Sequence, residues 1–214
     1  RTADILGNTG VHIGGTDLDR ALSFRELMPF LGRGTSYRSR NVEMPNAPYV
    51  TLSTWQLINL LYTQRSIREI GAMVQEAADP VRVSRLLEVV DKRCGHALLE
   101  KVEDAKIALT QADQVRTDFS DLLSDLHVTF TSASFVEAIA DQVAGIRRTV
   151  ADLLRRIGGH GKQIHTVFFT GGTSAVPILR NVILAQLPAA HVVDGDPVAA
   201  VGYGLALDAA RSLS

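Results

Sequence analysis

Two adjacent glycines, Gly171 and Gly172, stand between the apolar segment Val167–Phe169 and Thr173. Glycine lets a ligand approach the backbone closely, and a helix that starts next offers backbone N–H groups to an anion or to the edge of a purine. The same residues also fit a tight strand–helix turn that binds nothing. From this segment alone, both interpretations stay open.

A carboxylate and an ammonium group share one face of a predicted helix. Glu103 and Lys106 are three residues apart, and Thr110 lies about one turn after Lys106. Such a pair can accept hydrogen bonds from ribose hydroxyls and donate to them. The alternative is a solvated ion pair that stabilises the helix by roughly a few tenths of a kcal/mol.

Two further glycine-containing segments carry weaker signals. Gly14 and Gly15 precede Thr16 and Asp17, either of which can cap a helix. Near the end of the chain, Gly195-Asp196-Pro197 leads into a segment rich in small residues through Ala206. We interpret that last segment as structural, since small side chains allow a helix to pack closely on a sheet.

Composition excludes several classes of function. The formal net charge is −1, without the basic excess that nucleic-acid binding needs. No apolar run approaches the roughly 20 residues that span a bilayer. Cys94 is the only cysteine, so a disulfide within the chain and a cysteine zinc cluster are both excluded, and we expect Cys94 buried inside a helix in a reducing, cytoplasmic setting.

Other common sites are also absent from the pattern. The six histidines show no metal-ligand spacing, so no metal site is predicted. A P-loop is excluded, because Gln163 follows Gly161-Lys162 and Arg156 occupies the position of the loop's first glycine. No catalytic triad can be argued from residue order.

Hydrophobic periodicity and turn signals predict an α/β chain. The expected helices are one after Thr16 and others over 55–61, 66–78, 80–110, 132–157, 174–187 and 197–211. The longest, 80–110, is predicted to be one continuous helix. The expected strands are 3–6, a hairpin of 115–119 with 126–130, 164–170 and 191–193. Strands that alternate with helices indicate a parallel component, and we expect strand 3–6 to join the late strands in one sheet.

Four of the segments described above follow one another along the chain: Gly14-Gly15, Glu103 to Thr110, Gly171-Gly172 and Gly195-Asp196-Pro197. In this order they resemble the second lobe of the ATPase domain of DnaK-type heat-shock chaperones, and the resemblance extends from about residue 3 to residue 210. The resemblance looks closest to the short YegD-like relatives. It implies lobe two of an actin-like fold, with a ribonuclease-H-like core formed by residues 1–13 and 132–214. Residues 14–131 would be an inserted subdomain, mainly helical with a β-hairpin.

The resemblance also implies a site for ATP or ADP, with Mg²⁺ in the whole protein. The implied contacts to the adenosine are Gly15, Glu103, Lys106, Thr110, Gly171, Gly172 and Thr173. Three positions depart from the family pattern: Ile107 and Ala175 replace arginines that flank the adenine, and Val198 replaces an acidic residue. An apolar contact from Ile107 would then replace a cation–π contact.

By the same resemblance, the family's catalytic residues would lie upstream of residue 1, so no catalytic residue is assigned here. We expect ATP hydrolysis only in a longer parent protein. The expected partners are nucleotide, unfolded protein or a nucleotide-exchange partner, and the protein is expected to be a monomer. Two alternatives stay open: a lobe of an actin-like small-molecule kinase, and an interaction module whose nucleotide site has decayed.

Overall fold

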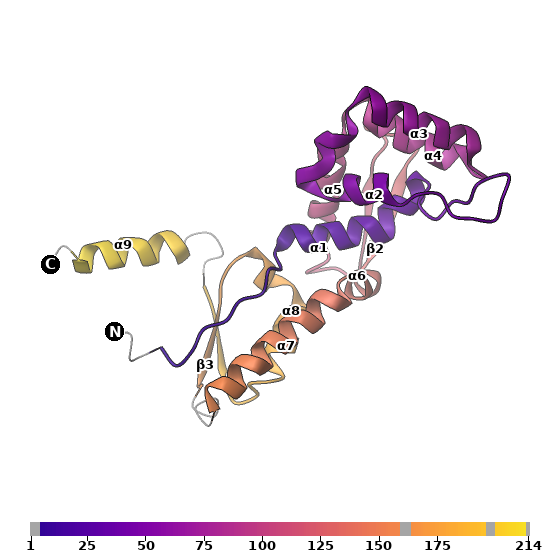
Figure 1. Ribbon diagram of the computed structural model, residues 1–214. Helices are drawn as coiled ribbons and strands as arrows, with labels where there is room; N and C mark the ends of the chain where they lie inside the picture. The colour runs from indigo at the N-terminus through magenta and orange to yellow at the C-terminus, as the bar shows by residue number, and fades with distance from the viewer. Residues whose placement is uncertain (1–4, 159–163, 196–199, 213–214) are drawn as a thin grey trace. The chain divides into compact units, whose positions relative to one another are not determined.

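The computed structural model describes residues 5–158, 164–195 and 200–212 (Figure 1). The chain divides into two compact units. Unit 1 comprises residues 1–15 and 140–214, and unit 2 comprises residues 16–139. Each unit is described by itself below.

Unit 2 is mainly helical and carries one β-hairpin. Its elements are α1 (Gly15–Leu22, whose first residue belongs to unit 1), a π-helical turn η2 (Ser23–Leu27), the 3₁₀ helix η3 (Met28–Leu31), α2 (Ala47–Ser53), the 3₁₀ helix η4 (Trp55–Leu61), α3 (Gln64–Glu76), α4 (Pro80–Asp91), α5 (Gly95–Ala108), β1 (Gln114–Asp118), β2 (His127–Thr131) and α6 (Ser132–Ala138). The predicted helices after Thr16, over 55–61 and over 66–78 are confirmed. Helix α2 was not predicted.

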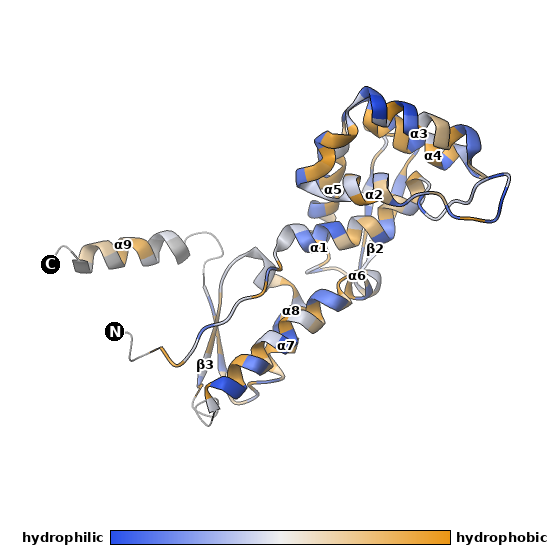
Figure 2. Cartoon of the chain, in the orientation of Figure 1, coloured by the Kyte–Doolittle hydropathy of each residue, from blue (hydrophilic) through white to orange (hydrophobic). Residues whose placement is uncertain are grey.

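The core of unit 2 lies between these helices and the hairpin. Helix α3 packs on α4, and polar and apolar stretches interleave along both (Figure 2). The hairpin is antiparallel, with Val115 opposite Phe130. The largest fully buried side chains include Tyr49, Phe119, Phe130, Leu18, Leu22, Met28 and Leu86. This core holds α1 and α5, which carry the candidate site, in fixed positions.

The prediction of one continuous helix over 80–110 is wrong. The helix breaks after Asp91, where Arg93 has a φ of 53°, and α5 starts at Gly95. A Cβ added at Gly95 would lie 2.8 Å from Ile58 and 2.9 Å from both Leu52 and Tyr62. The Gly95 amide also donates a hydrogen bond to the Tyr62 hydroxyl, at 3.0 Å. The break therefore serves a close contact between the start of α5 and distant residues.

The same break corrects the prediction for Cys94. It lies at the N-cap of α5, half-buried, rather than inside a helix. Burial raises the pKa of its thiol. A raised pKa lowers the thiolate fraction, so Cys94 is a poor nucleophile.

Replacing Gly95 by alanine tests this contact. Helix propensity alone would make the alanine variant more stable by up to about 1 kcal/mol. Because the added methyl group has no room, we expect instead a loss of about 1–3 kcal/mol in the free energy of unfolding, measured by urea denaturation.

Gly71→Ala is the matched control for that variant. Gly71 lies within α3, and a Cβ added there meets nothing within 4 Å. This variant should keep or gain stability, by up to about 1 kcal/mol. Two variants that change stability in the same direction would contradict the packing role of Gly95.

Unit 1 contains a two-stranded parallel sheet and helices. Its elements are α7 (Ala140–Arg156), β3 (Thr166–Phe169), the 3₁₀ helix η6 (Gly172–Ala175), α8 (Pro177–Leu184), β4 (His191–Asp194) and α9 (Ala200–Ser212). Strands β3 and β4 pair in parallel with Val167 opposite Val192, and α7 packs on α8. The predicted late strands and the α/β class are confirmed.

Three predictions for unit 1 and its border need correction. Residues 5–14 form no strand, so within the described residues β3 and β4 pair only with each other, and Ile5 and Leu6 are exposed. The predicted helix 132–157 is two helices, because the backbone leaves helical geometry at the buried Ile139 (ψ 14°). Helix α8 starts at Pro177 rather than Ser174, since η6 occupies the residues before it.

Several predicted features lie outside the described residues. These are residues 3 and 4 of the first strand and residues 196–199, which include Val198 and the start of the predicted helix over 197–211. Among the described residues, no helix combines the length and the apolar character that crossing a bilayer requires.

Candidate functional site

Lys106 is a buried cation held between two carboxylates. Its Nζ lies 2.8 Å from Oδ1 of Asp19 on α1 and 3.9 Å from Oε1 of Glu103, one turn earlier on α5. The side chains of Lys106 and Asp19 are 9% and 10% exposed, whereas that of Glu103 is 53% exposed. The interpretation of Glu103 and Lys106 as a solvated pair is therefore wrong, since the main partner of Lys106 is Asp19.

Asp19 was not recognised from the sequence. It lies far from Lys106 along the chain, and only the tertiary fold of unit 2 brings α1 and α5 close enough for the ion pair. Burial raises the pKa of the Asp19 carboxyl, and the hydrogen bond and charge of Lys106 offset that rise only in part. The pair fixes the ammonium group in place beside the exposed carboxylate of Glu103.

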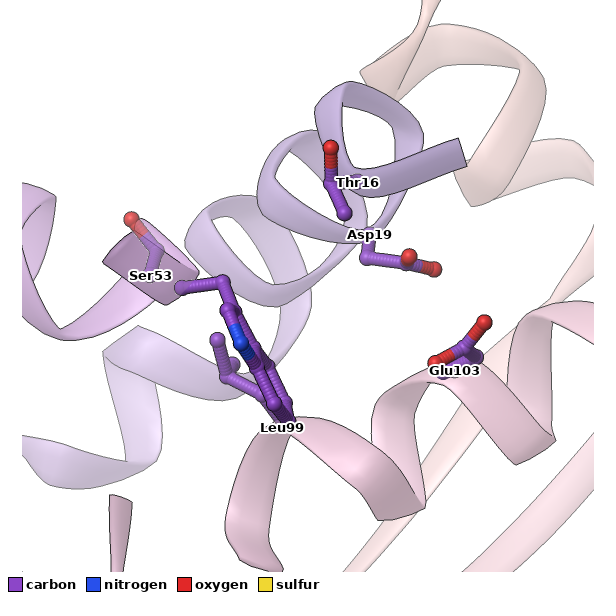
Figure 3. A pocket seen from close by; sticks show the side chains of 6 residues that line it. Thr16, Asp19, Ser53, Leu99 and Glu103 are labelled. Carbon is purple, nitrogen blue, oxygen red and sulfur yellow. The ribbon is translucent and has the colours of Figure 1, made fainter. Parts of the chain in front are cut away.

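A cavity of about 110 Å³ opens beside Glu103 in unit 2. Its lining residues come from α1, α2, η4 and α5, and they are Thr16, Asp19, Ser53, Trp55, Leu99 and Glu103. Figure 3 shows the side chains of Asp19 and Glu103 reaching toward each other from α1 and α5. The cavity thus joins carboxylate and hydroxyl oxygens with apolar walls, the combination typical of small-molecule sites.

Trp55 forms one wall of this cavity. Its ring meets the ring of His96 edge to face, with centroids 4.7 Å apart, and it is 38% exposed. The structure therefore places part of the indole at the surface of the cavity.

The turn after β3 belongs to unit 1. Gly171 has a φ of 83°, a conformation that favours glycine, and a Cβ added at Gly171 or Gly172 would meet nothing within 4 Å. Gly172 and Thr173 begin η6, and the Ser174 hydroxyl donates to the Gly171 carbonyl at 2.6 Å. The open space beside both glycines is compatible with close approach of a ligand to the backbone.

Arg180 braces this turn and was not singled out from the sequence. Its guanidinium lies 4.4 Å from the centroid of the Phe169 ring and donates to Asp194 at 2.6 Å. This hydrogen bond lowers the pKa of the Asp194 carboxyl. One side chain on α8 therefore ties together the ends of β3 and β4.

The predicted site residues fall into two groups. Glu103 and Lys106 lie on α5 in unit 2, and Thr110 follows just after that helix, with its hydroxyl donating to the Ile107 carbonyl at 2.7 Å. Gly15, Gly171, Gly172 and Thr173 belong to unit 1. The assembly of both groups around one nucleoside stays a prediction.

Three positions depart from the pattern of the family that the sequence resembles. Two of them, Ile107 and Ala175, lie within the described residues, and both are exposed. Ile107 is 55% exposed on α5, and Ala175 ends η6. Neither supplies a cation or an aromatic ring for stacking on a base. Any stacking partner in unit 2 must come from another residue.

Comparison with known proteins supports one family. A family model described as Hsp70 protein matches residues 79–211, more than half of the chain. The chaperone protein DnaK of Deinococcus proteolyticus is 26% identical over 127 residues, which are 56% of this chain and 20% of that protein. The chain thus spans about a fifth of the length of this curated relative.

Proposed function

Because the chain belongs to the Hsp70 protein family, we propose that it is the adenosine-binding lobe of a chaperone-type ATPase. ATP or ADP is the proposed ligand. Mg²⁺ binding and ATP hydrolysis are proposed only for the whole protein. The family match includes both α5 and the turn after β3, the two segments that carry the predicted contacts. Unit 1 would then be the ribonuclease-H-like core of the lobe, and unit 2 its insertion.

The observation that carries this proposal is the arrangement around Lys106. An ion pair with Asp19 holds its Nζ in place, and Glu103 presents an exposed carboxylate at the rim of a cavity. A carboxylate beside a fixed ammonium group can accept hydrogen bonds from vicinal hydroxyls while that ammonium group donates to them. The proposed role of Glu103 is therefore to bind the ribose, and Thr110, just after the end of α5, is a further proposed contact to the adenosine.

The remaining proposed contacts come from unit 1. Gly171, Gly172 and Thr173 would line the other side of the adenosine, and Gly15 would lie close to the ribose. Support for this comes from the open space beside both turn glycines. The proposed partners of the whole protein are unfolded polypeptide and a nucleotide-exchange protein.

Glu103→Ala is the direct test of the ribose contact. Its carboxylate is largely solvated, so the free energy of unfolding should change by less than about 0.5 kcal/mol. Loss of a charge-assisted hydrogen bond should weaken ADP binding roughly 10- to 100-fold, measured by titration calorimetry on the whole protein.

Asp104→Ala is the matched control, since it removes a neighbouring exposed carboxylate from another side of α5. Its ADP affinity should stay within about twofold of the wild type. Equal affinities for all three proteins would reject the assigned ribose contact. Absence of any ADP binding would favour the interaction module with a decayed nucleotide site.

A further inference from the structure

Asp19 and Glu103 compete for the same ammonium group. Lys106 Nζ lies 2.8 Å from the carboxylate of Asp19, but 3.9 Å from that of Glu103, which is too long for a hydrogen bond. The Asp19 side chain is 10% exposed and that of Glu103 is 53% exposed. The ammonium group is therefore paired with the buried carboxylate, and the exposed carboxylate beside it keeps its oxygens available to other donors.

The core of unit 2 fixes the position of Asp19. Leu18 and Leu22, on the same helix α1, are fully buried, and Lys106 is itself 8% exposed. A lysine ammonium group carries three N–H donors, of which one carboxylate oxygen engages only a part. Asp19 can therefore hold the Lys106 ammonium group while this group still donates to a ligand hydroxyl beside Glu103.

Removing the charge of Asp19 would change this balance. A buried ammonium group without a counter-ion is strongly unfavourable. Glu103 lies one turn from Lys106 on the same face of α5, so a rotation of its side chain that shortens the present distance by about 1 Å would form a direct ion pair. The Glu103 oxygens would then face Lys106 and be lost to a ligand.

We propose that Asp19 is a positioning residue for the ribose, because it holds Lys106 and so keeps the Glu103 carboxylate free to accept hydrogen bonds from both ribose hydroxyls. This inference rests on the proposed function. It gives a role to a residue outside the seven predicted contacts. Asp19 then determines how strongly the site prefers ribose to 2′-deoxyribose, although it acts only through its neighbours on α5.

The ratio of the affinities for ADP and 2′-deoxy-ADP measures this role, since a change that is merely structural would weaken both ligands alike. Titration calorimetry on the whole protein gives the two dissociation constants. Wild type should prefer ADP roughly 10- to 100-fold, as expected for one hydrogen bond to a charged group. Asp19→Asn should bind ADP about 10-fold more weakly and reduce the preference to less than about threefold.

Asp19→Glu is the conservative variant that should restore the preference. It keeps the negative charge for Lys106, and the cavity of about 110 Å³ that Asp19 lines has room for one additional methylene group. Its preference for ADP should stay within about threefold of the wild type. Thermal unfolding of Asp19→Asn and Asp19→Glu checks that both variants are folded.

A double variant shows whether Asp19 acts through Glu103. Glu103→Ala alone should lack the preference for ADP. Adding Asp19→Asn to it should change the ADP affinity by no more than about twofold, because the carboxylate that Asp19 keeps free is already absent. Losses that add in the double variant would show that the two residues act independently, and would overturn the inference.

A crystal structure of the wild-type whole protein with ADP covers the case in which Asp19→Asn does not fold. Lys106 Nζ should stay within hydrogen-bonding distance of Asp19, and the Glu103 oxygens should face the ribose hydroxyls. Glu103 paired directly with Lys106 in that structure would overturn the inference.

The outcomes separate this inference from the proposed function. If Glu103→Ala loses the preference for ADP and a folded Asp19→Asn keeps it, only the role of Asp19 is overturned. The same holds if wild type binds ADP and 2′-deoxy-ADP equally well. A protein that binds neither ligand would overturn both proposals.

Discussion

Replacing Lys106 by methionine should lower the free energy of unfolding by about 3–5 kcal/mol at neutral pH, because it leaves the Asp19 carboxylate buried without its cation. Methionine keeps most of the apolar contacts of the lysine stem, so the loss reports on charge rather than on packing. Urea denaturation at several pH values measures it.

The pH dependence of the loss has a definite sign. Burial raises the pKa of Asp19 in the folded chain above its unfolded value. Its proton therefore binds the folded state more tightly, which stabilises the fold at low pH, and this contribution is lost as the pH rises through the raised pKa. Without Lys106 the pKa rises further, so the loss should be largest at neutral pH and shrink toward pH of about 4.

Asp19→Asn combined with Lys106→Met is the control for this prediction. Removing both charges leaves no buried ion, so the double variant should be more stable than Lys106→Met alone by roughly 0.5–3 kcal/mol. A loss that is the same at every pH and is not relieved by Asp19→Asn would show that the ion pair does not support the fold. Lys106 is thus a poor probe of nucleotide contacts, and Glu103 a better one.

Signals that act within one turn were readable from the sequence. Asp79 caps α4 by accepting a hydrogen bond from the Arg82 amide at 3.1 Å, and Thr131 caps α6 by accepting one from the Ser134 amide at 3.1 Å. The predicted helices begin at the residues directly after these two, Pro80 and Ser132. The partners of the two capping residues lie three residues away, so local spacing contains the necessary information.

Features that depend on distant residues were missed for the same reason. The break before Gly95 depends on Leu52, Ile58 and Tyr62, while periodicity continues through it. The spacing of apolar residues shows only which face of a helix is buried. Because two successive helices can keep the same spacing, the spacing does not reveal the break between them.

The candidate site was predicted only in part. The spacing of Glu103 and Lys106 indicated a shared face, but the partner that buries Lys106 is on α1, and the cavity wall comes from η4. No local spacing relates these three elements. Residue types therefore located one side of the site, and the packing of unit 2 supplied the others.

The second prediction with a large expected effect concerns Gly32, where the backbone conformation and the packing each require a glycine. It ends η3 with a φ of 99°, a region that costs an alanine roughly 1–2 kcal/mol. A Cβ added there would also lie 2.6 Å from Cγ2 of the buried Val83 and 3.0 Å from the Tyr49 hydroxyl. Gly32→Ala should therefore lower the free energy of unfolding by about 2–5 kcal/mol.

Gly34→Ala separates the two demands. Gly34 has a φ of 83°, but a Cβ added there meets nothing within 4 Å. It should lose only the conformational part, roughly 1–2 kcal/mol. The difference between the two variants measures how rigidly Val83 and Tyr49 are packed.

Tyr49 gives a second readout of the same contact. Its hydroxyl donates to the Leu31 carbonyl at 3.3 Å, and burial raises its pKa to about 12. An alanine at position 32 that displaces this ring should lower the pKa toward its usual value, measured by absorbance titration against the Gly34→Ala variant. If Gly32→Ala and Gly34→Ala lose equal stability and the tyrosine titration is unchanged, the core of unit 2 accommodates the added methyl group. The helices that carry the candidate site would then be less firmly fixed than the burial of Val83 implies.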